Sequence, residues 1–400
     1  MVNNLNNLPV VKIKKGHDKR INNGYLWLFS NEIEHPVSEV RNGDIVEIIS
    51  PNGGFLGRGF YNRNSLISVR FLTNSKTELI ISLLQRRIKN ADEFRARIYP
   101  GRTAYRMVFS ESDLLPGLII DRYNSTFVLQ VNTAGMELLL PAIVNILITD
   151  HQASSIFTMS DKSIRQFEGL DYTNTQLFGE QHSEIIEVED IKYSIDFTNS
   201  QKTGFFFDQS VNRSYFSRFS ENCSVFDGFC NSGGFGMHAM KNGARQVVFA
   251  DSSNQQIETV KINIELNGLN DSLTEYVVDD VFDLLEKFIT DQRIFDVVIV
   301  DPPAFTKSKS KVQTALKGYE KLHHLAMQVL KPDGILMSTS CSHHISEIDY
   351  QQSIQKAATR TNSALQLIHR AGAAPDHPRL ASMDETAYLK FLVFRKIGLS

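Results

Sequence analysis

The feature that most constrains the fold is a series of five continuous apolar runs after residue 190. The runs are CSVFDGF (223–229), RQVVFADSS (245–253), LTEYVVDDV (273–281), IFDVVIVDPP (294–303) and GILMSTSCS (334–342). Helical stretches such as NQQIETVKINIELNG (254–268) separate them. Strands that are apolar along their whole length are buried on both faces, so the pattern predicts a parallel sheet covered by helices. Ligands of such sheets bind at the carboxyl ends of the strands.

The first part of the chain follows a different pattern. Its apolar runs are short and broken by turn signals, and they are RNGDIVEIIS (41–50), FLGRGFYN (55–62) and SLISVRFLT (65–73). The Asn-Gly turn between the first two favours antiparallel hairpins, so we expect a small β-barrel over residues 1–74. Residues 75–190 mix strands and helices, including an amphipathic helix over Glu78–Tyr99. The expected architecture is therefore α/β, with residues 191–400 forming the third domain.

The distribution of charge points to a polyanionic partner. Residues 1–110 contain 17 Lys and Arg against 9 Asp and Glu, a balance of +8, whereas the rest of the chain has a balance of −11. A basic amino-terminal part on an acidic body suggests a nucleic-acid-binding surface. On charge alone, the solvated basic face of an ordinary domain is an equal alternative.

Signals for targeting and for metal binding are lacking. The first residues have no apolar h-region of a signal peptide. The longest apolar run, Leu138–Ile148, is too short to span a bilayer and contains Pro141, so we expect a core helix and no membrane association. Cys223, Cys230 and Cys341 form no CxxC pair, which predicts a reducing cytoplasm and no metal site. The sequence leaves a homodimer open.

Acidic residues follow the first four apolar runs. The first run enters a glycine-rich loop at Asp227, whose spacing is neither G-x-G-x-x-G nor that of a phosphate loop. The second ends at Asp251, which suits two ribose hydroxyls, and the third at Asp280, which suits an adenine amino group. The fourth ends at Asp301, before two prolines that make a rigid platform for a flat base. Singly these features are turns or helix caps; together they fit S-adenosylmethionine, a nucleoside with a sulfonium and no phosphate.

From end to end, the chain resembles the family of large-subunit ribosomal RNA cytosine-C5 methyltransferases with an amino-terminal PUA domain. The matching stretches are GYLWLFSNEIE (24–34), GFLGRGFYNRNSLISVRFLT (54–73), SDLLPGLIIDRYN (112–124), SDKSIRQFEGL (160–170), QKTGFFFDQSVNR (201–213), DGFCNSGGFG (227–236), DPPAF (301–305) and STSCSH (338–343). A match over so many parts is specific, although DPPxF alone also occurs in other base methyltransferases. The resemblance implies a PUA RNA-binding domain, a mixed α+β middle domain and a Rossmann-like, class I methyltransferase domain.

The resemblance also implies which residues line the cofactor. These are Thr203, Phe205, Asp227, Phe229, Asn231, Gly233, Gly234, Asp251, Ser252, Asp280 and Asp301. The sequence departs from the family at Asp279, where Gly is expected, and at Ser210, where the motif has Arg.

Cys341 is the candidate nucleophile. C5 of cytosine takes a methyl group only after a thiolate adds to C6, and cysteine is the side chain best suited to this at neutral pH. Cys341 follows the fifth apolar run, and its Ser-Cys-Ser setting matches the family motif. An ordinary buried thiol is the alternative, and it is the role expected for Cys223 and Cys230. The nucleophile needs a nearby cation or helix terminus to lower its pKa, for which His343 and His344 are candidates.

Asp301 is the second catalytic candidate, because it could hold the cytosine through N3 or the exocyclic amine. The base must leave its stack to reach such a pocket, and Phe305 could then stack on it. Related cytosine enzymes often carry a second cysteine beside the prolines, where this chain has Ala304, so product release uses another group. RNA contacts are expected from Lys12, Lys14, Arg20, Arg58, Arg63, Phe305, Lys307 and Lys309.

Two other functions stay open from the sequence. An enzyme of the same fold that methylates a guanine nitrogen also uses Asp-Pro-Pro-aromatic, but that chemistry needs no cysteine. An RNA-binding assembly factor with a relict cofactor fold would need neither cofactor nor thiol. The intact Asp227, Asp251, Asp301 and Cys341 argue against the second of these.

Overall fold

The structure is a computed structural model that describes residues 8–34, 40–172, 174–198, 204–306 and 308–398. Its internal packing forms two compact units. The first comprises Met1–Ile186, Ile195–Phe207 and Pro375–Thr386, and the second comprises Glu187–Ser194, Asp208–Ala374 and Ala387–Ser400. The domain boundaries expected near residues 74 and 190 remain predictions.

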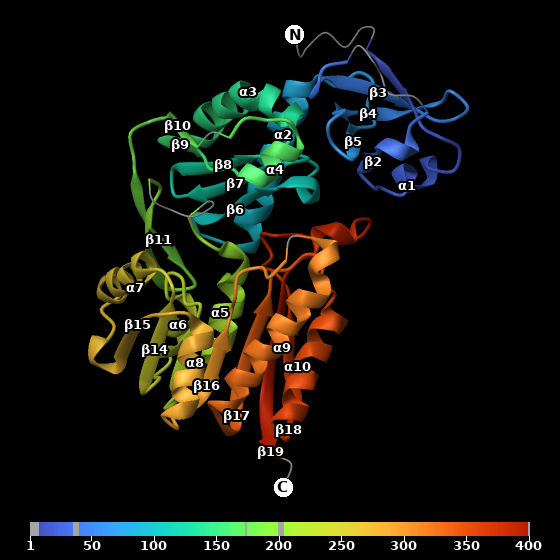
Figure 1. The fold of residues 1–400 in the computed structure, drawn as a ribbon. Coiled ribbons are helices and arrows are strands. Elements are labelled where there is room, and N and C mark those ends of the chain that lie inside the picture. The colour runs from blue at the N-terminus through green and yellow to red at the C-terminus, as the bar shows by residue number, and fades with distance from the viewer. Residues whose placement is uncertain (1–7, 35–39, 173, 199–203, 307, 399–400) are drawn as a thin grey trace. The chain divides into compact units, whose positions relative to one another are not determined.

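Five short strands form the amino-terminal barrel of the first unit (Figure 1). They are β1 (Val10–Lys12), β2 (Trp27–Phe29), β3 (Ile45–Ile49), β4 (Phe55–Tyr61) and β5 (Ile67–Thr73), in the order β1-β3-β4-β5-β2, with α1 (Asp18–Asn22) and η1 (Ser30–Glu32) in the connections. The strands β3, β4 and β5 pair as antiparallel hairpins, as the turn signals predict. A bridge between Ile13 and Ile33 joins the two edges of the sheet. Inside, alternate residues such as Val46 and Ile48 are fully buried.

A second sheet with its helices follows the barrel in the first unit. Its elements are α2 (Ile80–Ile98), β6 (Ala104–Phe109), η2 (Ser110–Asp113), β7 (Leu118–Tyr123), β8 (Thr126–Val131), α3 (Ala134–His151), β9 (Ser155–Thr158), α4 (Lys162–Phe167) and β10 (Thr175–Phe178), with strand order β10-β9-β8-β7-β6. The amphipathic helix α2 is present, as predicted. By length and composition α3 is apolar enough to cross a membrane. In this structure its Leu139, Ile143 and Leu147 lie in the core of the sheet and helices.

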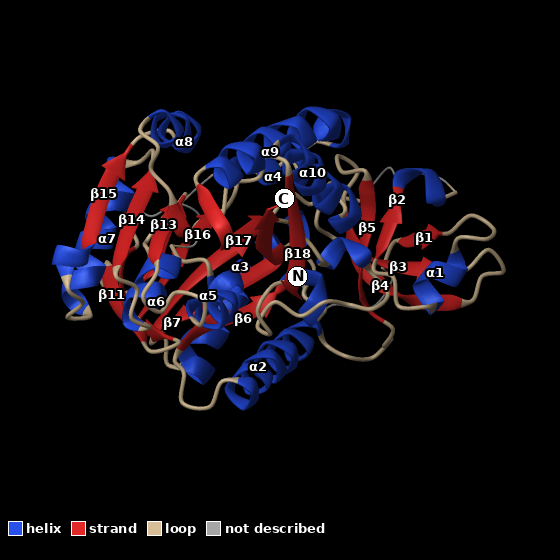
Figure 2. Cartoon of the chain, turned by 90° about the horizontal axis from the view of Figure 1, so that it is seen from below, coloured by secondary structure: helices blue, strands red, loops and turns tan. Residues whose placement is uncertain are grey.

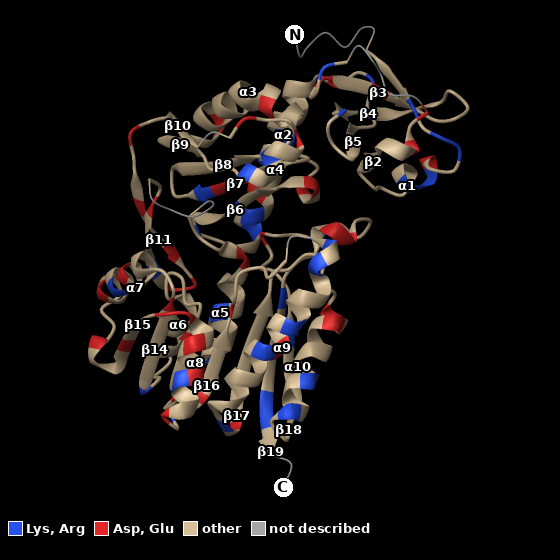
Figure 3. Ribbon diagram, in the orientation of Figure 1, with Lys and Arg blue, Asp and Glu red and all other residues tan. Residues whose placement is uncertain are grey.

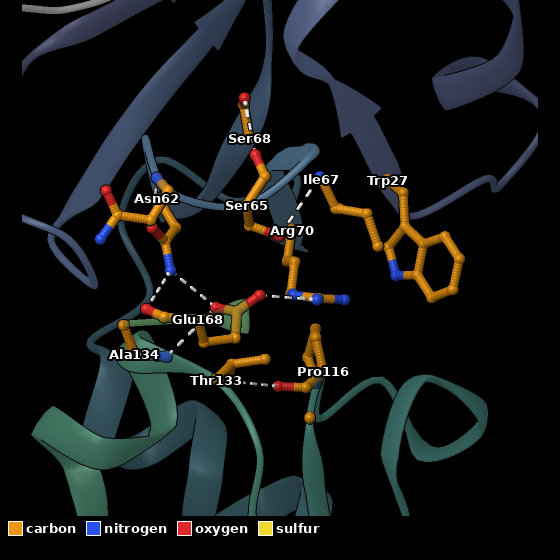
Figure 4. A network of polar contacts seen from close by, with 12 residues as sticks. Trp27, Asn62, Ser65, Ile67, Ser68, Arg70, Pro116, Thr133, Ala134 and Glu168 are labelled. Atoms are coloured by element: carbon orange, nitrogen blue, oxygen red, sulfur yellow. Dashed lines mark hydrogen bonds and ion pairs between the residues drawn. The ribbon is translucent and has the colours of Figure 1, made fainter. Parts of the chain in front are cut away.

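A buried polar network joins the barrel to this second sheet (Figure 4). Arg70 of β5 forms ion pairs with Glu111 at 3.2 Å and with Glu168 at 2.9 Å. Trp27 Nε1 donates to Glu111 at 2.8 Å, and Asn62 Nδ2 donates to Glu168 Oε2 at 2.8 Å. Both carboxylates are buried, so losing one partner would leave a buried charge uncompensated. The network therefore ties the barrel firmly to the sheet beneath it.

The second unit is built on a seven-stranded sheet. Its strands are β13 (Ser224–Gly228), β14 (Gln246–Asp251), β15 (Thr274–Val278), β16 (Phe295–Val300), β17 (Leu330–Ser340), β18 (Ser363–Ala371) and β19 (Lys390–Gly398), in the order β15-β14-β13-β16-β17-β19-β18. The first five are parallel and coincide with the five apolar runs, which confirms the predicted sheet. β19 runs antiparallel between β17 and β18. The chain order of the strands reverses between β13 and β16, where sheets of this kind bind ligands.

Helices cover both faces of this sheet (Figure 2). They are α5 (Ser210–Ser217), α6 (Gly234–Lys241), α7 (Asn254–Leu266), α8 (Val281–Thr290), α9 (Val312–Gln328) and α10 (Glu347–Arg360). Figure 2 shows α8, α9 and α10 on one face and α6 and α7 on the other. The remaining short elements are β11 (Ser183–Val188), β12 (Ile191–Asp196), η3 (Phe207–Gln209), η4 (Asp271–Leu273), η5 (Lys309–Lys311) and η6 (Asp384–Thr386). The α8–α10 face packs as one apolar core with β13, β14, β16 and β17.

Candidate active site

The loop after β13 holds its backbone in a strained conformation. Phe229 and Asn231 have φ angles of 63° and 50°, a region that non-glycine residues rarely adopt, and Gly233 has a φ of 80°. Gly234 begins α6, and a Cβ atom there would lie 2.6 Å from Arg213 Nε, so a larger residue would have to displace the Arg213 side chain. Such strain persists only where the surroundings enforce it, and it gathers at binding sites.

Asp227, near the carboxyl end of β13, is almost completely buried. Its Oδ2 accepts the N–H of Gly236 at 2.8 Å, while Oδ1 has no hydrogen-bond partner among the described residues. Burial, with the charges of Asp301 and Asp251 nearby, raises the pKa of Asp227 to about 7. A buried carboxylate oxygen without a donor is suited to a ligand that brings a cation or an N–H group.

The next two strand ends carry further carboxylates. At the end of β14, Asp251 accepts the N–H of Asn231 at 3.1 Å and that of Ser253 at 3.0 Å, so it braces the loop after β13. Ser252 beside it is exposed. After β15, Asp280 is the N-cap of α8, where its Oδ1 accepts the N–H of Phe282 at 2.8 Å. The capping role that Asp residues often have after a strand is thus realised at Asp280.

Asp301 follows β16 and is held by two side chains. Thr339 Oγ1 donates to Asp301 Oδ1, and Gln209 Nε2 lies 3.3 Å and 3.4 Å from the two carboxylate oxygens. Asn212 in turn donates to Gln209 Oε1 at 2.7 Å and fixes the amide. Burial raises the pKa of Asp301 to about 6, with a further contribution from Asp208. At neutral pH this carboxyl group is therefore close to its titration range.

Cys341 follows β17 directly, and its two neighbours are anchored. Ser340 Oγ donates to the hydroxyl of Tyr319 at 3.0 Å, and Ser342 Oγ lies 3.0 Å from the same hydroxyl. Tyr319 projects from α9 and is fully buried. One tyrosine thus fixes the backbone on both sides of a half-exposed cysteine. The structure brings this residue to the same edge of the sheet as Asp227, Asp251 and Asp301, as the sequence predicts.

Three of the expected site residues cannot be placed at this edge. Thr203 and Lys307 lie outside the described residues, and Phe205 belongs to the first unit. Phe305 does lie after β16, where its ring stacks on Tyr319 with 4.3 Å between centroids. One of its faces is therefore occupied by protein.

The basic residues expected to contact RNA differ in exposure. Lys14 is exposed and donates to the backbone of Asn31, while Lys12 pairs with Glu34 at 3.2 Å. Figure 3 shows Lys and Arg interspersed with acidic residues along the barrel strands and loops. Arg20 pairs with Glu32 at 2.6 Å and its guanidinium lies over the ring of Tyr25.

The remaining expected RNA contacts fall into two groups. Arg58 is buried and pairs with Glu47 at 3.0 Å. Since a buried guanidinium cannot reach a phosphate, we leave Arg58 out of the RNA surface proposed below. Arg63 is exposed, with its guanidinium donating to the backbone oxygen of Val40 at 3.4 Å, and Lys309 is exposed in η5.

Several residues of the site were not identified from the sequence. Gln209 and Thr339 hold Asp301, and Tyr319 holds the segment around Cys341. Tyr319 lies in a helix whose apolar pattern predicts only a core position. Gln209 belongs to the stretch 201–213 that resembles the family, and that resemblance is the one signal that could have found it.

The family comparisons match both parts of the chain. A PUA-like domain model matches residues 11–74, and a model of S-adenosylmethionine-dependent methyltransferases matches residues 171–395. The chain is 36% identical over 391 residues to ribosomal RNA large subunit methyltransferase I from Aeromonas hydrophila, covering 96% of this chain and 98% of the relative.

Solved structures show the same fold. A SAM-dependent methyltransferase from Streptococcus mutans is 18% identical and superposes with a TM-score of 0.84, covering 97% of this chain and 100% of the other. A methyltransferase solved with S-adenosylhomocysteine superposes over the same shares of both chains with a TM-score of 0.85 and 18% identity. At this identity the likeness concerns the fold.

The residues at the sheet edge fit S-adenosylmethionine. The unpartnered Oδ1 of buried Asp227 suits its cationic amino-acid end, because an ionised carboxylate there needs a positive partner. The tight loop at Gly233 and Gly234 allows close approach of the backbone. Asp251 ends the neighbouring strand, where sheets of this type bind a ribose.

Proposed function

We propose, since this chain belongs to the family of PUA-containing S-adenosylmethionine-dependent methyltransferases, that it methylates C5 of a cytosine in large-subunit ribosomal RNA. The substrate class is supported by the name of the full-length relative. The observation that carries the choice of C5 is Cys341, a half-exposed thiol at the sheet edge with both neighbours anchored by Tyr319. Carbon methylation of a pyrimidine requires such a nucleophile.

In the proposed reaction, the Cys341 thiolate adds to C6 of the cytosine and electron density moves to C5. S-adenosylmethionine, when bound, supplies a methyl group on a sulfonium sulfur. C5 forms its new bond to that carbon as the bond between the carbon and the sulfur breaks, and the sulfur leaves as a neutral thioether. A base then removes the proton from C5, and the C6–sulfur bond breaks to return the thiolate. Charge and atoms balance, because the proton lost from C5 replaces the positive charge of the sulfonium.

Asp301 acts in this proposal on the pyrimidine ring. Its pKa of about 6 means that part of the population is protonated near neutral pH. A protonated carboxyl group can donate to N3 as the thiolate adds to C6, which offsets the charge that develops in the ring. Thr339 and Gln209 keep the carboxyl group in place for this role.

RNA affinity is assigned in this proposal to the barrel and to the loop after β16. The barrel contributes Lys12, Lys14, Arg20 and Arg63, and the loop contributes Lys309. Phosphate contacts of this kind position an RNA without reading its sequence. We further propose that the protein acts in the cytoplasm, since its cysteines form no disulfide in the described residues.

The second candidate, methylation of a guanine nitrogen, keeps the fold and Asp301 but gives Cys341 no role. The test is the product nucleoside. Large-subunit RNA incubated with the protein and labelled S-adenosylmethionine is digested to nucleosides and separated by chromatography. We expect the label in 5-methylcytidine; label in an N-methylguanosine would reject the proposal.

The covalent step has its own test. An RNA with 5-fluorocytosine at the modified position cannot lose its C5 substituent as a proton, so we expect the enzyme to be trapped on it. Cys341→Ala should abolish both trapping and turnover but still bind the cofactor. A variant that methylates at a near-normal rate would make the thiol structural.

A further inference from the structure

Lys390 is a buried cation on the strand that pairs with the segment before the candidate nucleophile. It begins β19, and its Cα is the antiparallel partner of Ser340, the residue before Cys341. Directly paired residues of two antiparallel strands point to the same face of the sheet. For Ser340 and Lys390 this is the face of Tyr319 on α9 and Tyr350 on α10, because these tyrosines hydrogen-bond with Ser340 and Ser338 of β17.

Hydrogen bonds hold the ammonium group of Lys390 at the backbone of the residue that follows the cysteine. Nζ donates to the backbone oxygen of Ser342 at 2.6 Å and to that of Tyr388 at 2.8 Å. The Lys390 residue is 7% exposed, which is rare for lysine. An ammonium has three donors, so two carbonyl bonds leave a third N–H for a neighbouring group. The bond to Ser342 places the charge one residue from Cys341.

We infer that Lys390 is a positioning residue whose ammonium group holds Cys341 as a thiolate, the form that adds to the pyrimidine ring. This inference rests on the proposed function and supplies the cation that the reaction needs. His343 and His344, the cations suggested by the sequence, are exposed instead.

The electrostatic coupling of the two groups works in both directions. Burial lowers the pKa of Lys390 to about 8, and the negative charge of Cys341 opposes that shift. Coupling between two titrating groups is reciprocal, so the ammonium must favour the thiolate to the same extent. A lysine beside a cysteine is one of the settings that lowers a thiol pKa.

Other titrating groups surround this pair. Glu347 at the start of α10 also raises the pKa of Lys390, and it forms an ion pair with Arg370 of β18 at 3.2 Å. Tyr319 and Tyr350 have raised pKa values, chiefly from burial, and stay neutral. Asp301 acts on Tyr350 as a further acidic group of the site. Arg213, also buried, acts on Asp227 and Asp301, whereas Lys390 is the buried cation bonded to the backbone next to Cys341.

The test measures the pH dependence of Cys341 alkylation by iodoacetamide in the full chain, read by mass spectrometry of its peptide. Lys390→Met removes the charge and keeps a long apolar stem, while Lys390→Arg keeps the charge. We expect the Met variant to shift the alkylation midpoint upward, with the rate near neutral pH falling by about tenfold, and the Arg variant to restore it. Cys223, at the other end of the sheet, serves as the internal reference. An unchanged midpoint in Lys390→Met overturns the inference.

A second variant decides the matter if Lys390→Met does not fold. In Cys341→Ala, the pKa of Lys390 should fall, because the partner charge that raises it is gone. The rate of reductive methylation of Lys390 as a function of pH reports this change. An unaltered titration of Lys390 overturns the inference in this variant too.

The alkylation of Cys341 and the titration of Lys390 use neither RNA nor cofactor, so they test the inference separately from the proposed function. Formation of 5-methylcytidine in the same variants then tests the proposed function. A shifted thiol midpoint with slower 5-methylcytidine formation, recovered at high pH, supports both. A shifted thiol midpoint with an unchanged rate of 5-methylcytidine formation supports the role of Lys390 and rejects Cys341 as nucleophile. An unshifted midpoint rejects the role of Lys390 whatever the methylation rate.

Discussion

In the site, Asp227 has opposite effects on the stability of the empty protein and on the binding of the cofactor. Its carboxyl group is buried, has one backbone donor, and leaves one oxygen without a partner among the described residues. Burial raises its pKa to about 7, so ionising it in the absence of a ligand is unfavourable. A bound cation removes that penalty. The ionised carboxylate of Asp227 should therefore destabilise the fold of the empty protein and stabilise the complex with the cofactor.

Binding of S-adenosylmethionine should depend on pH through Asp227. Because the ionised carboxylate is the form that attracts the cofactor's amino group, affinity should rise by about tenfold as the pH increases from about 5.5 to about 7.5. Calorimetric titration measures this directly. Asp227→Asn should bind weakly with little dependence on pH. Asp301→Asn is the matched control and should keep a transition near neutral pH; an Asp227→Asn variant with the full pH dependence would contradict the assignment.

The stability of the empty protein should change in the opposite direction. A carboxyl group whose pKa is raised in the folded state stabilises the fold at low pH, and this contribution is lost as the pH rises through about 7. Because asparagine does not ionise, Asp227→Asn should not lose this stability as the pH rises. Its melting temperature without cofactor should exceed that of the wild type at about pH 8 and approach it at acidic pH. A lower melting temperature at both pH values would mean that the carboxylate is compensated in the empty protein.

The sequence identifies the site residues that follow an apolar run, and misses those that reach the site from a neighbouring strand. Asp227, Asp251, Asp301 and Cys341 each end a run, so their common edge follows from the parallel sheet. Thr339 reaches Asp301 because β17 lies beside β16 in the sheet, with Val300 opposite Ser338. No local pattern encodes which strands become neighbours.

Among the secondary-structure elements, β18 and β19 were not predicted, because local patterns do not show which strands pair. β18 is an edge strand with a mixed pattern, SALQLIHRA, and therefore lacks the continuous apolar run that marked the parallel strands. β19 is apolar but comes last, after an irregular stretch that contains Pro375 and Pro378. Its antiparallel pairing with β17 is determined by tertiary contacts and not by a local pattern. This pairing places Lys390 opposite Ser340.

Helix α9 supports the segment around Cys341 through one hydroxyl group. Tyr319→Phe keeps the packing of the ring but removes its bonds to Ser340 and Ser342, so the free energy of unfolding should fall by about 1–3 kcal/mol. Loss of anchoring should lower kcat for methylation and leave cofactor affinity unchanged. Tyr105→Phe, which removes a bond to Asp92 in the first unit, is the matched control and should cost stability without slowing methylation. Equal kcat values in the two variants would show that Tyr319 does not position the cysteine.

At the scale of the whole molecule, the barrel is joined to its neighbouring sheet by buried charges. Deleting residues 1–74 would remove Arg70, Trp27 and Asn62 and leave Glu111 and Glu168 without these partners. It would also remove Phe60 and Leu72, which belong to the apolar core of the second sheet. A deletion thus confuses loss of RNA contacts with loss of fold, and substitutions of exposed charges test the barrel better.

Lys14, Lys15 and Lys19 are exposed on the barrel and serve this purpose. If they contact phosphates, replacing all three with Ala should weaken RNA binding at low salt and reduce the slope of log affinity against log salt by about two, because fewer counterions are released. Cofactor affinity should stay the same. The control replaces two exposed lysines elsewhere, Lys89 on α2 and Lys356 on α10, and should leave the slope unaltered. The decisive measurement is the slope, since a general loss of affinity could follow from a damaged fold, whereas a smaller slope requires that phosphate contacts have gone. An unchanged slope in the triple variant would mean that the RNA does not contact this part of the barrel.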